Sequence, residues 1–102
     1  FRRCIEENIP IAFGTDSGTP FNFHGKQAYE FQLMCENGMT PAQALTAATR
    51  TASQLMQKWN EVGSVEAGKF ADVVAFDGDP MEDITAMTRC CFVMKGGEVY
   101  KA

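Results

Sequence analysis

The feature that most constrains this chain is a short apolar run, Ile-Pro-Ile-Ala-Phe at residues 9–13, which ends abruptly in Gly-Thr-Asp-Ser-Gly at 14–18. A run this short, bounded by proline and glycine, predicts a strand over residues 11–14 that is buried on both faces rather than a helix. Asp16 would then lie just beyond the carboxyl end of that strand. Parallel α/β folds place their ligands and their chemistry at this end, so Asp16 is the first candidate for a functional residue.

Composition limits the classes of function. The 102 residues make at most one domain and can bury a modest core. With 45% hydrophobic and 22% charged residues, the chain has the composition of a soluble globular protein. A net charge of -4 gives no electrostatic reason to expect a nucleic-acid partner. No apolar run approaches the roughly 20 residues that span a membrane, so we expect no membrane partner either.

The cysteines bear on the cellular compartment. Cys4, Cys35, Cys90 and Cys91 show no CxxC spacing, and we expect buried, reduced thiols rather than a disulfide framework. Reduced thiols favour a cytoplasmic protein. The chain begins with Phe1 rather than Met and reads like a piece of a longer protein, which leaves an upstream signal sequence open.

The amino-terminal part reads as helices around one strand. The tail of a helix is expected over residues 1–8, before the strand at 11–14. The loop over 17–24 carries two phenylalanines, which either cap the core or line a pocket. A helix is predicted over 25–37, and the glycine directly after it is a typical stop signal.

A second helix is predicted to start at Thr40-Pro41-Ala42-Gln43, because these residues form a capping box with proline at the first helical position. We expect this helix to continue to about residue 59. Its apolar residues fall on one stripe at helical spacing: Ala44, Leu45, Ala48, Ala52, Leu55 and Met56.

The carboxyl-terminal part has β character. Its expected elements are a turn-rich stretch at 63–69, a strand at 71–76, a short helical turn near 81–86, and strands at 91–94 and 98–101 around a two-glycine hairpin turn. The chain therefore divides at about residue 61 into an α/β part and a β part.

The sequence contains few groups of residues that could form a catalytic or ligand-binding site. There is no GxGxxG or GxSxG motif, and His24, the only histidine, has no spacing that suggests a base for a nucleophile. Asp16 remains, because its carboxylate could bind a divalent cation and accept a proton from the water that the cation activates. It could also cap a turn, as aspartate commonly does between glycines, and spacing alone favours this simpler interpretation.

A series of motifs runs through nearly the whole chain, in order and with natural spacing. They are Gly-Thr-Asp-Ser-Gly at 14–18, Glu-Asn-Gly-Met-Thr-Pro-Ala-Gln-Ala-Leu at 36–45, Ala-Ala-Thr at 47–49, Gly-Ser-Val-Glu-Ala-Gly-Lys-Phe-Ala-Asp-Val-Val at 63–74, Asp-Gly-Asp-Pro at 77–80 and Val-Met-Lys-Gly-Gly-Glu-Val-Tyr at 93–100. Each motif alone is weak. Together they resemble the carboxyl-terminal region of the amidohydrolase superfamily, nearest to its imidazolonepropionase-like and Xaa-Pro dipeptidase-like branch.

The resemblance implies an α/β fold, a metal-dependent (β/α)8 barrel with a small β-sandwich built from both chain ends. Residues 1–60 would supply the last strand and helices of the TIM-type barrel. Residues 61–102 would supply the carboxyl-terminal part of the sandwich. Residues 57–60, Gln-Lys-Trp-Asn, depart from the glycine-rich turn that relatives usually have.

The resemblance also implies a hydrolase that cleaves C–N bonds of a small-molecule substrate, a dipeptide or a cyclic amide, with water activated by a divalent metal, zinc by expectation. Asp16 would match the family's aspartate after the eighth strand, which binds the metal and carries a proton from the hydrolytic water. The family's other ligands, a His-x-His pair, two further histidines and often a modified lysine, are absent from this sequence. One carboxylate does not hold a catalytic zinc, so the isolated chain is expected to be inactive.

The same incompleteness bears on assembly. One strand of eight cannot close a barrel, and half a sandwich leaves unpaired edges. We therefore expect exposed apolar surface over residues 11–13 and 73–76, and a homo-oligomer that covers it. The alternative, from a different functional class, is a self-standing, non-catalytic α+β module that binds a partner through its sheet edges.

Overall fold

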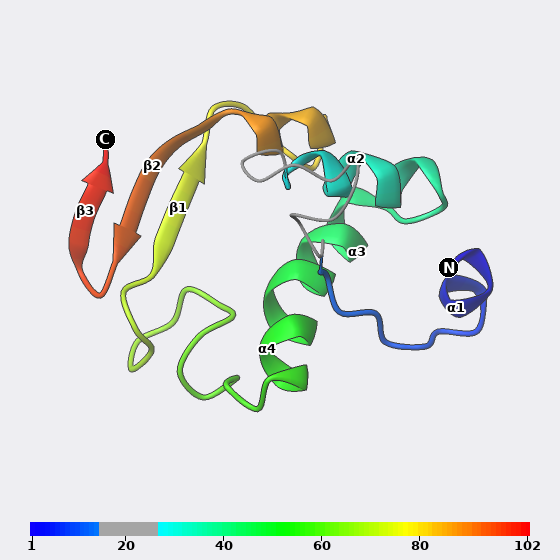
Figure 1. Ribbon diagram of the computed structural model, residues 1–102, viewed down its shortest axis with the longest axis horizontal. Coiled ribbons are helices and arrows are strands. Elements are labelled where there is room, and N and C mark those ends of the chain that lie inside the picture. Colours follow the sequence, from blue (N-terminus) through cyan, green and yellow to red (C-terminus); the bar gives the residue numbers. More distant parts are fainter. Residues whose placement is uncertain (15–26) are drawn as a thin grey trace.

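The helices α1 to α4 lie in the first part of the described chain, and an antiparallel sheet lies at the carboxyl-terminal end (Figure 1). The computed structural model describes residues 1–14 and 27–102. Its elements are α1 (Arg2–Glu6), α2 (Tyr29–Glu36), α3 (Pro41–Thr46), the π-helical turn η1 (Ala47–Thr51), α4 (Ala52–Leu55), β1 (Val73–Phe76), the 3₁₀ helix η2 (Ile84–Thr88), β2 (Cys90–Lys95) and β3 (Glu98–Lys101). The continuous helix α3–η1–α4 runs between the sheet on one side and α1 on the other.

The start of α3 is fixed by its capping box, as the sequence predicts. The Thr40 hydroxyl oxygen accepts the Gln43 backbone N–H at 3.2 Å, and the Gln43 side-chain oxygen accepts the Thr40 N–H at 2.9 Å. Pro41 occupies the first helical position. These contacts satisfy backbone donors that would otherwise have no partner at the helix start.

The end of α2 is also set by local sequence. Gly38 adopts a φ of +120°, its N–H donates to the Cys35 carbonyl at 3.2 Å, and the Met39 N–H donates to the Met34 carbonyl at 3.1 Å. Both methionine side chains are buried in the core. This is a Schellman motif with its hydrophobic contact. The predicted helix is confirmed, although α2 begins at Tyr29 rather than at residue 25.

The long helix differs from the prediction in its second half. Its first residues bury Ala44 and Ala47, but the chain widens into the π turn η1 and the helix ends at Leu55. Leu55 and Met56 are 73% and 66% exposed, so their predicted place on the apolar stripe is wrong. A π turn closes over one more residue than an α turn, which rotates the residues after it around the axis. The buried position after η1 is Ser53.

The predicted strand over residues 11–14 is wrong for the described structure. This segment pairs with no strand within residues 1–14 and 27–102. Its backbone instead bonds to a helix, because the Phe13 N–H donates to the Ala47 carbonyl at 3.0 Å. A strand buried on both faces needs neighbours on each side to take its N–H and C=O groups, and the described chain supplies neither.

The sheet at the end of the chain is antiparallel in the order β1-β2-β3. Gly96 and Gly97 join β2 to β3 with φ values of +58° and +84°, the signs that a type I′ hairpin turn requires. The predicted hairpin is therefore confirmed. The Gly96 N–H also donates to the Asp72 carboxylate at 2.9 Å, which ties the turn to the residue just before β1.

A small apolar core joins the helices to the sheet. It lies around α2 and is formed by Phe31, Met34, Met39, Ala44, Ala47 and Met87. Because Met87 belongs to η2, the segment between β1 and β2 packs directly on α2. The core thus draws on both sides of residue 61, and the division into 1–60 and 61–102 stays a prediction.

The core leaves much of the molecule uncovered. The chain exposes 7196 Å² of surface, whereas a compact folded protein of 11.2 kDa exposes about 5,700 Å². The predicted exposure is confirmed in part for β1, where Val74 is 54% exposed while Val73 and Phe76 are half-buried. It is wrong for residues 11–13, which are half-buried because Ile11 and Phe13 pack against the core.

Gly63 provides a test of the close packing beside α4. Its φ of +105° is unfavourable for other residues, and a Cβ there would overlap the Ser53 side chain and lie 3.0 Å from the Trp59 ring. We expect Gly63→Ala to lower the free energy of unfolding by about 3 kcal/mol, through backbone strain and overpacking together. Urea denaturation measures this loss.

Gly68 is the matched control, because its φ is +92° but nothing lies within 4 Å of the added Cβ. Gly68→Ala should cost about 1 kcal/mol from backbone strain alone. Equal losses for the two variants would contradict the proposed packing against Ser53.

Candidate functional site

Asp16, the predicted catalytic and metal-binding residue, lies outside the described residues, as do His24 and the loop at 17–24. The described chain stops at Gly14, two residues before Asp16, and resumes at Gln27. The structure therefore describes the residues that contact the segment before Asp16, and not Asp16 itself.

That support is built around Phe13. Its backbone N–H donates to the Ala47 carbonyl in η1 at 3.0 Å. Its ring stacks on Phe31 of α2, with 4.5 Å between the ring centroids and 29° between the planes. Phe31 is 9% exposed and Ala47 is 2% exposed, so both partners belong to the core. One hydrogen bond and one aromatic contact therefore hold the chain three residues before Asp16.

No metal centre is formed by the described residues themselves. Within residues 1–14 and 27–102, no three His, Cys, Asp or Glu side chains lie close enough together to hold a metal ion. A catalytic zinc takes about three protein ligands. Asp16 could contribute one of them, and the others would have to come from beyond the described part of the chain.

The cysteines form no metal ligand set with the other described residues. Cys4, Cys35, Cys90 and Cys91 are free thiols, so no disulfide forms, as the spacing predicts. Burial raises the pKa of the Cys35 thiol, which keeps it protonated and unreactive. None of the four thiols is fully buried, because Cys4, Cys35 and Cys90 are half-buried and Cys91 is exposed, so the prediction of buried cysteines is wrong.

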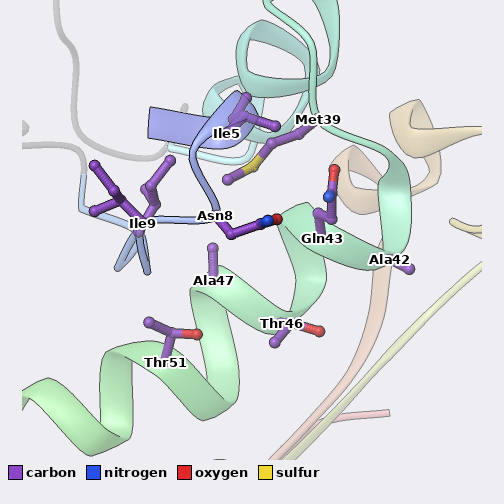
Figure 2. Close-up of a pocket in the computed structure, with 10 residues that line it drawn as sticks. Ile5, Asn8, Ile9, Met39, Ala42, Gln43, Thr46, Ala47 and Thr51 are labelled. Atoms are coloured by element: carbon purple, nitrogen blue, oxygen red, sulfur yellow. The ribbon is translucent and has the colours of Figure 1, made fainter. Parts of the chain in front are cut away.

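A hollow of about 300 Å³ opens between the residues after α1 and the start of the long helix (Figure 2). Its walls are Ile5, Asn8, Ile9, Ile11, Met39, Ala42, Gln43, Thr46, Ala47 and Thr51. None of these side chains is ionisable, so the hollow contains no general acid or base. The Gln43 side chain is already engaged in the capping box.

The charged group with the most contacts among the described residues is Lys69. Its Nζ lies 3.3 Å from the centroid of the Trp59 ring, 2.8 Å from the Ser64 hydroxyl oxygen and 3.2 Å from a Glu66 carboxylate oxygen. The lysine side chain is only 8% exposed. The guanidinium carbon of Arg50 lies over the same ring at 5.2 Å.

These contacts give a structural role to Trp59, one of the unusual residues 57–60. Trp59 places a π face against two cations, one from η1 and one from the segment before β1, and such contacts attract when the cation is desolvated. Through Trp59, which also faces Arg50 of η1, Lys69 links the segment before β1 to the long helix. Sequence reasoning missed the contact, because Trp59 and Lys69 are ten residues apart with no periodic relation.

In the parts of the chain that the structure describes, no helix has the length and apolar character needed to cross a membrane.

Comparison with known proteins shows the family of this chain. Residues 1–100 match the model of the amidohydrolase family. An imidazolonepropionase of Shouchella clausii is 32% identical, over 96% of this chain and 23% of the relative. An ochratoxinase of Aspergillus niger is 33% identical, over 99% of this chain and 21% of the relative.

A solved structure agrees with the curated relatives. A Xaa-Pro dipeptidase with methionine bound in its active site is 39% identical, with a TM-score of 0.94 over 99% of this chain and 24% of that one. The resemblance inferred from the motifs is therefore confirmed. The chain spans only about a quarter of the length of these proteins.

The contacts of Glu66 generate a prediction about pH. Hydrogen bonds from Ser64 and Lys69 hold the pKa of the Glu66 carboxyl below its usual range. A carboxyl with a lowered pKa stabilises the fold above its unfolded pKa of about 4.3, and that contribution disappears as the pH falls through the folded pKa. Glu66→Gln should therefore lower the urea midpoint at about pH 6, and this loss should shrink as the pH falls below the unfolded pKa of about 4.3.

Glu61→Gln is the control, because among the described residues Glu61 forms an ion pair with an exposed lysine, Lys58, at 3.6 Å, and such surface pairs contribute little. A Glu66→Gln effect that does not change with pH would contradict the assigned role of the carboxylate.

Proposed function

This chain belongs to the amidohydrolase family, and from that premise we propose that it is the carboxyl-terminal segment of a metal-dependent hydrolase that cleaves C–N bonds. The observation that carries the proposal is the match of residues 1–100 to the family model. Dipeptides and cyclic amides are the proposed substrates, because the relatives include a Xaa-Pro dipeptidase and an imidazolonepropionase. The family match favours this hydrolase over a non-catalytic module that binds through its sheet edges.

The proposed architecture assigns residues 1–60 to the end of a (β/α)8 barrel and residues 61–102 to a composite β-sandwich. Two features support it. β1 and β3 each have one free edge in the three-stranded sheet. The exposed surface exceeds that of a compact protein of this mass, as expected if further polypeptide covers it.

The proposed site uses Asp16 as one of several ligands to a divalent metal, which we propose to be zinc. Such a metal supplies the positive charge that makes water acidic enough to lose a proton near neutral pH. The described residues cannot complete its ligand set, so the isolated chain should be inactive. Asp16 would hold one coordination position, take the proton of the hydrolytic water and deliver it toward the leaving nitrogen.

The proposal also includes a cellular location and an oligomeric state for the enzyme. Free thiols at all four cysteines support a reducing, cytoplasmic location. We also propose a homo-oligomer, because large apolar side chains such as Leu55, Met56, Val65 and Phe70 are exposed and association is one way to cover such side chains.

Replacement of Asp16 tests the site. In the full-length protein, Asp16→Ala should lower kcat for dipeptide or cyclic amide hydrolysis by about a thousandfold or more, because it removes a metal ligand and the proton acceptor together. Steady-state assays on a panel of dipeptides and cyclic amides measure the effect.

Asp79→Ala serves as the control, since the Asp79 carboxylate accepts the Met81 N–H in an exposed turn after β1. This variant should keep kcat within about twofold of the wild-type value. Hydrolysis at the wild-type rate by Asp16→Ala would overturn the assignment of Asp16.

A further inference from the structure

We propose that Cys90 and Cys91 form a dithiol site that binds one thiophilic electrophile, of the class that trivalent arsenicals represent, through both sulfurs. The inference goes beyond the proposed function and does not depend on it. The two residues are consecutive at the start of β2, the central strand of the sheet. Both are free thiols, and Cys91 is exposed, so a small molecule in solution can reach the pair.

A β-bulge brings the two side chains to the same face of the sheet. In a regular strand they would point to opposite faces, because successive side chains alternate. Ala75 of β1 lies opposite Phe92, but the next residue, Phe76, lies opposite Cys90, which leaves Cys91 as an extra residue in β2. In such a bulge two residues oppose one, and residues that oppose each other share a face. Cys90 and Cys91 therefore both lie on the face that carries Phe76.

The hydrogen bonds of the two thiols place both sulfurs beside one pair of opposed residues. Cys90 Sγ donates to the Phe92 carbonyl at 3.5 Å, and Cys91 Sγ donates to the Ala75 carbonyl at 3.5 Å. Ala75 and Phe92 lie directly opposite each other, next to the bulge. A thiol is a weak donor, so little is lost when both sulfurs turn from these carbonyls toward a shared ligand.

The number of sulfurs decides which ligand fits. Within residues 1–14 and 27–102, no third His, Cys, Asp or Glu joins the two thiols in a group that could hold a metal ion, whereas a structural zinc takes four ligands. Sulfur ligands prefer soft partners, and an aryl arsenical of the form R–As=O takes two of them. Its As=O bond breaks, two As–S bonds form, and the two thiol protons leave with the oxygen as water. Arsenic stays trivalent, so the step needs no oxidant or reductant.

Two sulfurs on one ligand bind far more tightly than one. After the first As–S bond has formed, the second thiol is held at a high effective concentration, and such linkage raises affinity by about a hundred- to ten-thousandfold. A monothiol in solution therefore removes an arsenical from a single cysteine and leaves it on the pair.

The test is retention of phenylarsine oxide by the full-length protein in an excess of 2-mercaptoethanol, with bound arsenic measured by mass spectrometry after gel filtration. The wild-type protein should retain one equivalent more than Cys90→Ser or Cys91→Ser. Either substitution should raise the dissociation constant of the site by about a hundredfold or more. The double variant should lose no more arsenic than either single variant. Cys35→Ser, on α2, is the control and should retain as much as the wild type.

A second pair of cysteines tests whether the bulge is needed. Val74→Cys with Ala75→Cys, in a protein that also carries Cys90→Ser and Cys91→Ser, places consecutive thiols at two exposed positions of β1 where the register is regular. These thiols should point to opposite faces and should retain no arsenical against the monothiol.

Three results would overturn the proposal. The first is equal retention by the wild-type protein and Cys90→Ser. The second is a loss in only one of the two single variants, because a lone thiol would then be the ligand. The third is full retention by the cysteine pair in β1, because adjacency in the sequence, and not the bulge, would then account for binding.

Discussion

The structure depends on the packing of three separate parts of the chain against α2. Phe13 comes from the amino-terminal segment, Ala44 and Ala47 from the long helix, and Met87 from the 3₁₀ helix that precedes β2. This cluster is the only buried apolar core within the described residues. Burial of apolar surface is the dominant force that holds a fold together, so the positions of the sheet, the long helix and the segment before Asp16 all depend on this one contact region (Figure 1).

The parts of the fold that local chemistry determines were predictable from the sequence. Thr40 and Gln43 contain the capping box, Gly38 the helix stop, and Gly96 with Gly97 the hairpin turn, because each signal acts within a few residues. The strand expected at 11–14 was wrong, since a strand is defined by neighbours that the described chain does not supply. The π turn at Ala47–Thr51 and the contact between Trp59 and Lys69 have no local signature.

The candidate site, like the fold, could be predicted from the sequence only in part. The motif series identified the family, which the comparisons confirm, and through it Asp16. Spacing alone favoured a turn cap for that residue. The supporting contacts, from Phe13 to Ala47 and Phe31, could not be predicted, because they join segments that are 18 and 34 residues apart. The chain therefore carries one proposed ligand, and under the proposed function the other ligands would come from residues beyond the described part of the chain.

The central claim is that Asp16 is one ligand of a metal site completed by residues outside this chain. The most direct measurement is the metal content of the purified full-length protein and of its Asp16→Ala variant, determined by inductively coupled plasma mass spectrometry. The account predicts that the wild-type protein retains a divalent metal, that the variant loses a large part of it, and that residues 1–102 alone retain none. Undiminished metal in the variant, or metal bound by residues 1–102 alone, would contradict it.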